Sequence, residues 1–424
     1  MFKPSTSLLF HLTAAATLAF ASQSHAIESW SVDIQGNGSA GFGQSNPALL
    51  QAGPDAQWGQ GNVWNAFNVP AHNLAAAVNP SLALVDTTGA ATTANFQIFG
   101  NVAGFSNGSG NALFRDYLFA NAGNSSVSFT WQITGLTPGK KYDMINFGGV
   151  ARDAAIGIDK DGNGSVETVK ITPVNAGSIY RAITADATGK IVGTMANGTG
   201  DAEGNWAGFH LSESLPTARL WSVDIQGTGS PTTMTGIDPT YDAGNVWNAF
   251  TVAHHAGTSV NPSAALVDSS GAASPVNFAI TGTVSGFNNG SPDALTRDYL
   301  FINAGGASQN LTWQLTGLDP GALYEMFVYG GAIGGRTFNM AIDLDGDGTL
   351  VDETLRNVGA GGALFGLIRP DATGRIIGNA LNAGTEGNWA GFQLRQVQLP
   401  VPEPASMSLL AIGGLALLRR RVKN

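Results

Sequence analysis

Two short acidic segments, one in each half of the chain, have residue types and spacing suited to metal binding. Residues 159–164 read Asp-Lys-Asp-Gly-Asn-Gly, and residues 343–348 read Asp-Leu-Asp-Gly-Asp-Gly. Carboxylate or amide oxygens stand at alternate positions in both segments, which suits a hard cation with oxygen ligands. The candidate calcium ligands are therefore Asp159, Asp161, Asn163, Asp343, Asp345 and Asp347.

The spacing resembles the first half of an EF-hand calcium loop, but the second half departs from that pattern. An EF-hand has a bidentate glutamate at its twelfth position, where this chain has Lys170 and Thr354. Glu167, or Asp352 and Glu353, would substitute by closing a shorter loop. The alternative is a plain hairpin turn, in which Asp-Gly and Asn-Gly supply the positive φ that such turns need.

Two Asn-Val-Trp-Asn segments suggest carbohydrate recognition. Trp64 with Asn65, and Trp247 with Asn248, would offer a flat ring for a pyranose and amides beside it. The alternative, which we favour, is the hydrophobic core, where a tryptophan buries about 200 Å². We also expect core positions for the other matched tryptophans considered, which are Trp131, Trp206, Trp313 and Trp389.

No set of residues has the spacing of a known catalytic centre. The chain has no cysteine, and its body has no histidine in a zinc-type spacing. A glycosidase needs two acids about 5 to 10 Å apart, and the sequence does not place its matched acids together. The neighbouring Arg115 and Arg297 favour structural ion pairs for Asp116 and Asp298. We therefore expect a protein that is not an enzyme. The matched acids are Asp33 and Asp224, Asp86 and Asp268, Asp116 and Asp298, and Glu203 and Glu386.

The body of the chain that carries these residues is an internal repeat. Trp-Ser-Val-Asp-Ile-Gln-Gly occupies residues 30–36 and again 221–227, and Gly-Asn-Val-Trp-Asn-Ala-Phe occupies 61–67 and again 244–250. Further matches follow in the same order. Because there are only two long copies, the pattern indicates two domains and no solenoid of short repeats. The predicted domains are 27–215 and 216–398.

Within each copy the pattern is that of successive β-strands. Val127, Phe129, Trp131 and Ile133 alternate with polar residues, which is the period of a half-buried strand. Turn signals recur, and no stretch of the body keeps a helical period. The predicted fold class is all-β, with two tandem β-sandwiches. The paired strands around a proline-glycine turn resemble galactose-binding-like jelly-roll domains, which implies a jelly-roll-like sandwich.

Composition narrows the classes of partner. The chain has 57 glycines, no cysteine and a formal net charge of -10, and five of its 20 lysines and arginines lie in the terminal segments. The fold must therefore be held without disulfides. An acidic body repels phosphate backbones, so we expect no nucleic-acid partner.

Both ends of the chain read as targeting segments. At the N-terminus, Lys3, an apolar stretch and Ser24-His25-Ala26 predict a signal peptide over residues 1–26, removed by signal peptidase. At the C-terminus, residues 399–424 contain a Pro-Glu-Pro box, a short apolar run and three arginines. A helix of roughly twelve apolar residues spans about 18 Å, less than the bilayer core of about 30 Å. The tail therefore predicts a transient hold in the inner membrane, with its basic end on the cytoplasmic side.

This C-terminal order of parts resembles the PEP-CTERM sorting signal of Gram-negative bacteria. The resemblance implies that exosortase processes the tail after export, and that the body then reaches the cell surface or the extracellular space. It also implies a short hydrophobic sorting helix. The residues that carry it are Pro402, Glu403, Pro404, Arg419, Arg420 and Arg421.

Three functions fit these observations. The favoured one is a noncatalytic cell-surface or extracellular-matrix protein. The alternative is a pair of carbohydrate-binding modules whose partner is an extracellular polysaccharide. A polysaccharide hydrolase is the third.

Overall fold

The structure, a computed structural model, describes most of the body of the chain. The described residues belong to one compact unit, which spans Ile27–Leu399. The predicted signal peptide and sorting tail lie outside the described residues. In the described part of the chain, no helix is both long and apolar enough to span a bilayer. The described residues are 27–36, 49–55, 62–71, 74–150, 152–198, 200–227, 233–238, 241, 245–255, 257–304, 306–331, 336–359, 361–384 and 386–398.

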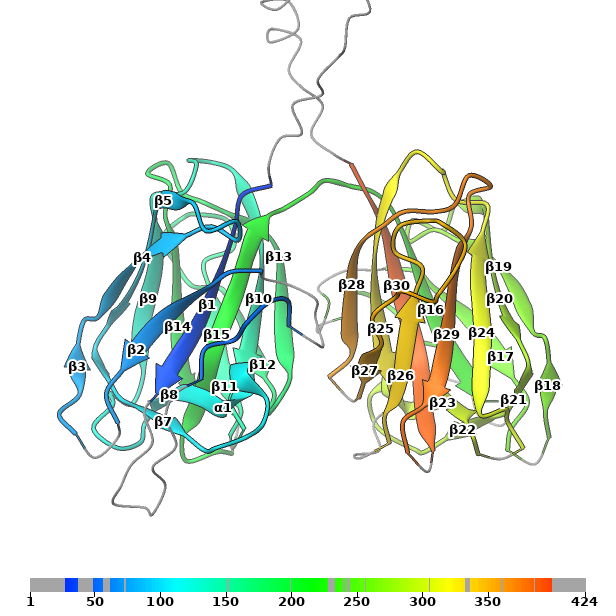
Figure 1. The fold of residues 1–424 in the computed structure, drawn as a ribbon, viewed down its shortest axis with the longest axis horizontal. Helices are drawn as coiled ribbons and strands as arrows, with labels where there is room; N and C mark the ends of the chain where they lie inside the picture. Colours follow the sequence, from blue (N-terminus) through cyan, green and yellow to red (C-terminus); the bar gives the residue numbers. More distant parts are fainter. Residues whose placement is uncertain are drawn as a thin grey trace, which may run out of the picture. The chain divides into compact units, whose positions relative to one another are not determined.

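One layer of the first repeat is a seven-stranded sheet (Figure 1). Its first strand is parallel to the second and antiparallel to the last strand of the repeat. The order is β13 (Gly177–Thr184), β10 (Lys141–Gly148), β15 (Gly204–Glu213), β1 (Ser29–Gly36) and β2 (Trp64–Val69); β8 (Asp116–Ala120) pairs with β15, and β7 (Gly104–Ser106) pairs with β8.

The other layer of the first repeat is an antiparallel six-stranded sheet. Its order is β12 (Thr168–Thr172), β11 (Ala154–Ile158), β14 (Ile191–Asn197), β9 (Phe129–Thr134), β5 (Ala91–Phe99) and β4 (Ser81–Val85). A further pair of short strands joins β3 (Ala77–Val78) to β6 (Asn101–Val102).

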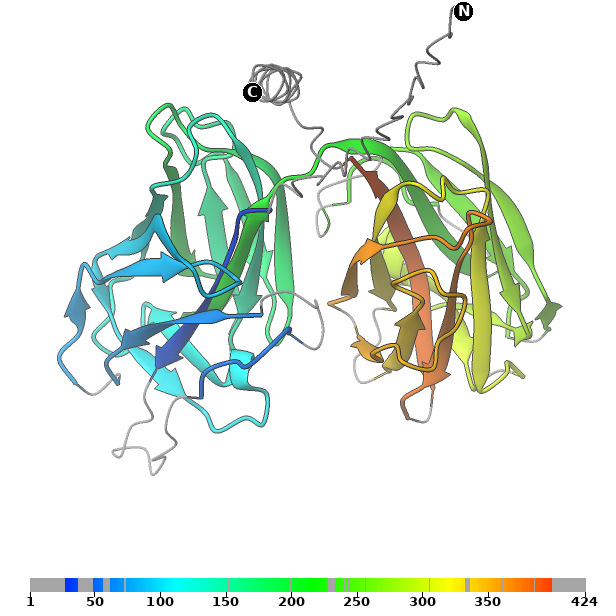
Figure 2. The ribbon, with the colours of Figure 1, turned by 45° about the horizontal axis from the view of Figure 1, so that its top comes forward.

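The second repeat has the same arrangement (Figure 2), and no sheet among the described residues mixes strands of the two repeats. The prediction of two tandem β-sandwiches is confirmed. The large sheet contains β17 (Trp247–Val252), β16 (Thr217–Gly227), β30 (Gly387–Val397), β23 (Asp298–Ile302) and β22 (Gly286–Asn288), with β25 (Leu323–Gly330) between β30 and β28 (Ala363–Ile368). The second sheet contains β19 (Ser263–Val267), β20 (Ala273–Thr281), β24 (Asn310–Thr316), β29 (Ile376–Asn382), β26 (Phe338–Ile342) and β27 (Arg356–Val358), and β18 (Ser259–Val260) pairs with β21 (Thr283–Val284).

The core of each sandwich follows the alternation in the sequence. On β9, Phe129, Trp131 and Ile133 are buried, whereas Thr130 is exposed. The ring of Trp131 lies 5.7 Å from that of Trp206. Trp313 and Trp389 occupy the equivalent places, with their rings 6.1 Å apart. The prediction that these four tryptophans belong to the core is confirmed.

A single helical turn precedes one strand of each large sheet. In the first repeat α1 (Ala112–Arg115) begins after Asn111, whose side chain accepts hydrogen bonds from two backbone amides. In the second, α2 (Ala294–Arg297) begins after Asp293. Both are N-capping residues of the usual type. Each turn ends one residue before an aspartate, so it fixes the start of β8 or β23 at Asp116 or Asp298.

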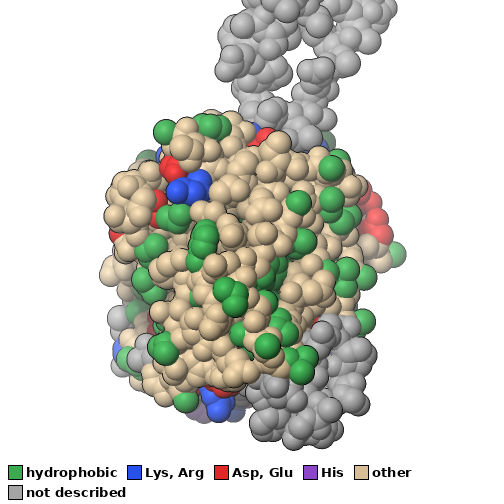
Figure 3. Space-filling model, turned by 90° about the vertical axis from the view of Figure 1, so that its left-hand side faces the viewer, with side chains coloured by type: hydrophobic (Ala, Val, Ile, Leu, Met, Phe, Trp, Pro, Cys, Tyr) green, Lys and Arg blue, Asp and Glu red, His purple; other side chains and the backbone are tan. Residues whose placement is uncertain are grey.

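One face of the body carries few charged side chains (Figure 3). On the face seen in Figure 3, scattered hydrophobic side chains lie among neutral polar ones, and the few lysines and arginines do not form a stripe. This agrees with the low charged fraction of 12%.

Candidate functional site

The first acidic loop connects β11 to β12, two neighbouring antiparallel strands. Asp159 is buried, and its two carboxylate oxygens accept hydrogen bonds from the amides of Gly162 at 2.9 Å and Gly164 at 2.7 Å. Both glycines have positive φ, so the plain-turn interpretation describes the backbone. The loop also gathers charge: Asp159, Asp161 and Glu167 each place a carboxylate oxygen within 4.8 Å of the others.

Glu167 closes this loop through hydrogen bonds to two backbone amides. Its Oε1 accepts hydrogen bonds from the amides of Lys160 at 2.6 Å and Asp161 at 3.2 Å. The side-chain nitrogen of Asn163 donates to Asp161 Oδ2 at 3.0 Å, and the side-chain oxygen of Asn163 accepts from the amide of Ser165 at 2.7 Å. The loop therefore brings together the carboxylate oxygens of Asp159, Asp161 and Glu167, and the Asn163 oxygen is engaged by the backbone.

The second acidic loop connects β26 to β27 and concentrates more charge. Asp343, Asp345 and Asp347 each place an oxygen within 4.8 Å of the others, and Glu353 Oε1 accepts from the amide of Leu344 at 2.6 Å. Burial raises the pKa of Asp343, and the charges of Asp347 and Asp345 raise it further. Burial and the charge of Asp343 raise the pKa of Glu353 as well. A bound cation would relieve this repulsion.

Trp64 and Trp247 do not form open platforms, which corrects the carbohydrate-binding expectation for them. Their side chains are only 5% and 7% exposed. The indole of Trp64 donates to the carbonyl of Gly53 at 2.9 Å, and that of Trp247 donates to Gly236 at 3.0 Å. In each repeat a segment after the first strand thus covers the ring. Both tryptophans therefore belong to the hydrophobic core, which is the interpretation favoured from the sequence.

Asn65 and Asn248 are structural for the same reason. The amide of Asn65 donates to the carbonyls of Ser31 at 2.9 Å and Val85 at 2.8 Å, and its oxygen accepts from the amide of Val85. Asn248 makes the equivalent bonds in the second repeat. These side chains join the two layers at the sheet edge, and their polar atoms are already engaged.

Two pairs of matched acids lie buried in the large sheets. Asp33 on β1 and Asp116 at the start of β8 are fully buried, as are Asp224 and Asp298 in the second repeat. Burial raises the pKa of Asp33, and the charge of Asp116 adds to the increase. Burial raises the pKa of Asp224 to about 7, with a further contribution from Asp298.

The ion pair expected between Arg115 and Asp116 is not found among the described residues. Arg115 Nε instead donates to Ser106 Oγ at 3.2 Å, and Asp116 accepts from the amide of Leu49 at 2.7 Å. Arg115 lowers the pKa of Asp116 slightly, but burial outweighs it and the net shift is upward. The acid is held by backbone and not by its neighbour in the sequence.

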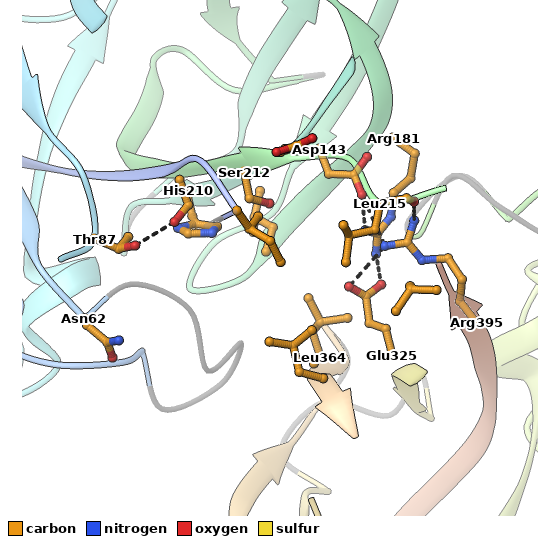
Figure 4. A pocket seen from close by; sticks show the side chains of 17 residues that line it. Asn62, Thr87, Asp143, Arg181, His210, Ser212, Leu215, Glu325, Leu364 and Arg395 are labelled. Carbon is orange, nitrogen blue, oxygen red and sulfur yellow. Dashed lines mark hydrogen bonds and ion pairs between the residues drawn. The ribbon is translucent and has the colours of Figure 1, made fainter. Parts of the chain in front are cut away.

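A buried ionic cluster joins the two repeats, and sequence reasoning missed it (Figure 4). Arg181 of the first repeat lies 2.7 Å from Asp143 and 2.5 Å from Glu325 of the second repeat. Arg395 lies 3.3 Å from Asp143 and 3.4 Å from Glu325. Tyr241 donates to Glu325. Although burial disfavours ionisation, the two arginines lower the pKa of both acids.

This cluster borders a cavity of about 290 Å³. His210, on β15, also lines it, and its Nδ1 lies 2.9 Å from Ser31 Oγ. Burial lowers the pKa of His210 to about 4, so the imidazole is neutral at pH 7. Asp143, Arg181 and Arg395 could not have been chosen from the sequence, because no motif surrounds them and their ionic partners lie far away in the chain, in the same repeat and in the other one.

The class defined by these observations is an all-β protein of two sandwiches, with acidic loops and buried acid pairs at equivalent positions. The chain carries a PEP-CTERM protein-sorting motif, which matches residues 400–422. This confirms the resemblance found around Pro402, Glu403 and Pro404. No curated protein matches the sequence.

Solved structures with some similarity include carbohydrate-related proteins. The tandem CBM22-1-CBM22-2 domain of Paenibacillus barcinonensis Xyn10C is 8% identical, with 71% of this chain and 91% of that chain covered and a TM-score of 0.20. TmCBM61, solved with β-1,4-galactotriose, is 12% identical, with 28% and 84% covered and a TM-score of 0.16. Paenibacillus xanthan lyase is 13% identical, with 72% and 25% covered and a TM-score of 0.21. The fold assignment rests on the sheets described above.

Proposed function

We propose that this chain is an exported, exosortase-sorted, noncatalytic protein of the cell surface or extracellular matrix, built from two β-sandwiches. The PEP-CTERM motif at residues 400–422 is the observation that carries the proposal. Such a motif implies export and a temporary hold in the inner membrane by the tail. Signal peptidase and exosortase are the proposed partners during export.

The body supports a structural role in two ways. Its matched tryptophans and asparagines hold the sandwiches together, so they are not available as a sugar platform. Its charged side chains at the repeat junction neutralise one another in a buried cluster. Both features favour a stable module that is displayed, and neither requires a substrate.

The sorting part is tested by comparing the full chain with a chain that stops after residue 399. The full chain should pass through the inner-membrane fraction and then appear at the surface or outside. The truncated chain, which lacks the tail, should accumulate in the periplasm. Identical distributions of the two proteins would refute the sorting role.

The alternative is that the sandwiches bind an extracellular polysaccharide. A glycan array with residues 27–398 tests it, because binding would require a surface other than the one around Trp64 and Trp247. The hydrolase alternative is tested on the same polysaccharides, by comparing the wild type with Glu203→Gln. Turnover that is lost in this variant would overturn the noncatalytic proposal.

We further propose that the two acidic loops bind calcium. The close carboxylate oxygens of each loop support this, and so does the raised pKa of Asp343, which is caused by burial first and then by the charges of Asp347 and Asp345. Calcium at 100 times its dissociation constant should stabilise the body by about 2.7 kcal/mol per site.

The calcium proposal is tested by melting residues 27–399 with calcium and with a chelator. The melting temperature should rise with calcium in the wild type, and the rise should shrink in a variant with Asp161→Asn and Asp345→Asn. Asp186→Asn is the matched control, because Asp186 caps a similar turn with Thr188 but belongs to neither loop. A wild-type midpoint that calcium leaves unchanged would rule the proposal out.

A further inference from the structure

The buried acid pairs are separate from the acidic loops and occur at equivalent places in both repeats. Asp33 lies on β1 and Asp116 at the start of β8; Asp224 lies on β16 and Asp298 at the start of β23. All four side chains are fully buried. At another equivalent position the first repeat has His210 and the second has Gln393, whereas both repeats have the two acids.

The strands hold the two acids of a repeat close together. β1 and β8 both pair with β15, at Gly208 and Trp206 respectively. β1 then packs directly on β8, since a side chain on Gly36 would come within 2.7 Å of the Tyr117 carbonyl. In the second repeat Gly227 is equally confined, because a side chain there would lie 2.7 Å from the amide of Phe287 on β22, the partner of β23.

A single covering segment binds one oxygen of each acid in the first repeat. The amide of Leu49 donates to Asp116 Oδ2 and that of Gln51 donates to Asp33 Oδ2, both at 2.7 Å. These amides are two residues apart, so they require the carboxylates to lie near each other. In the second repeat the amide of Met234 donates to Asp224 Oδ2 at 2.8 Å.

In three of these acids, Asp33, Asp116 and Asp224, the other carboxylate oxygen has no hydrogen-bond donor among the described residues. This oxygen is Oδ1 in each of the three, and it is buried. Nor does any described lysine or arginine form an ion pair with these three acids. Leaving a carboxylate buried without a partner is costly, and here two acids share one enclosed place.

We propose that each pair binds one divalent cation through these inward oxygens, with Asp33 and Asp116 in the first repeat and Asp224 and Asp298 in the second. Two carboxylates balance a charge of two, and a ligand set of oxygens suits a hard ion such as Ca²⁺ or Mg²⁺. The ion would tie β1 to β8 and hold down the segment that covers Trp64. It therefore serves the fold, and it is independent of the calcium proposed for the loops.

The test counts ions in residues 27–399, the compact unit, after dialysis against chelator and return to CaCl₂ or MgCl₂ at neutral pH. The variant with Asp161→Asn and Asp345→Asn removes the loop sites from the count. This variant should retain two ions by elemental analysis, and a count of zero would overturn the proposal. Asp224→Asn added to this variant should lower the count from two to one and reduce the rise in melting temperature.

A second result of the Asp224→Asn experiment would also refute the inference. If the added change leaves the ion count at two, the ions are bound elsewhere. If the chelator-treated body binds no ion, and the variant with Asp224→Asn melts at a higher temperature than the loop variant in every buffer, the acid pair shares a proton and holds no metal. A count of zero in the loop variant refutes the proposal even where Asp224→Asn does not fold.

Discussion

Replacing His210 by glutamine should make the body more resistant to acid. His210 is only 4% exposed, and its Nδ1 lies 2.9 Å from Ser31 Oγ. The equivalent residue of the second repeat is Gln393, whose amide donates to Ser222 Oγ at 2.9 Å. The substitution therefore installs a side chain that the same fold already accepts at the same place.

The magnitude follows from the pKa of His210, which burial lowers from 6.5 to about 4. Below pH 6.5 the imidazole of residue 210 is protonated in the unfolded chain and remains neutral in the folded chain. The free energy of unfolding therefore falls as the pH falls toward 4. At 1.36 kcal/mol per pKa unit, the wild type should lose about 2 kcal/mol by pH 5 and about 3.4 kcal/mol well below pH 4. His210→Gln removes this loss.

Denaturant unfolding of residues 27–399 at pH 7.5, 6 and 5 measures the effect. The difference in unfolding free energy between variant and wild type should move by about 2 kcal/mol in favour of the variant between pH 7.5 and pH 5. Gln393→His is the matched control and should move the difference in the opposite direction. A difference that does not change with pH would show that folded His210 accepts protons freely, and would refute the reasoning.

Two further predictions concern the junction and the core. Glu325→Gln should lower the free energy of unfolding at pH 7 by about 3 to 5 kcal/mol, because it removes one of the two carboxylates that neutralise the buried arginines. Denaturant unfolding measures this change. A decrease of less than about 1 kcal/mol would mean that the cluster is solvated. Since both acids of the cluster have lowered pKa values, its contribution is present at neutral pH and should disappear in acid. Gly193→Ala would place the new Cβ 2.2 Å from the Trp131 ring. It should lower the free energy of unfolding by about 1 to 3 kcal/mol. Gly110→Ala, where nothing lies within 4 Å of the new Cβ, is the control and should be nearly neutral.

Much of the fold could be predicted because strand alternation is a local signal. Phe129, Trp131 and Ile133 already show the period of two that places them in the core. The acidic loops were equally visible, since their oxygens come from alternate residues of one short segment. In both cases the information lies within about ten residues of chain.

The remaining features depend on contacts between distant segments. Trp64 is buried because residues 49–55 cross over it, and nothing beside Trp64 in the sequence shows this. Asp33 and Asp116 meet only because β1 and β8 border the same strand. Arg181 contacts Glu325, which lies 144 residues away in the sequence. Each is set by topology, which local pattern does not encode.

The central claim, an exported body released by processing of its tail, is tested most directly by the mass of the protein in cells with and without the exosortase. With the enzyme, the exported protein should lack the signal peptide and the apolar and basic residues that follow Pro404. Without it, the chain should keep this tail and remain with the inner membrane. Release of the protein with its tail intact, equally in both strains, would contradict the account.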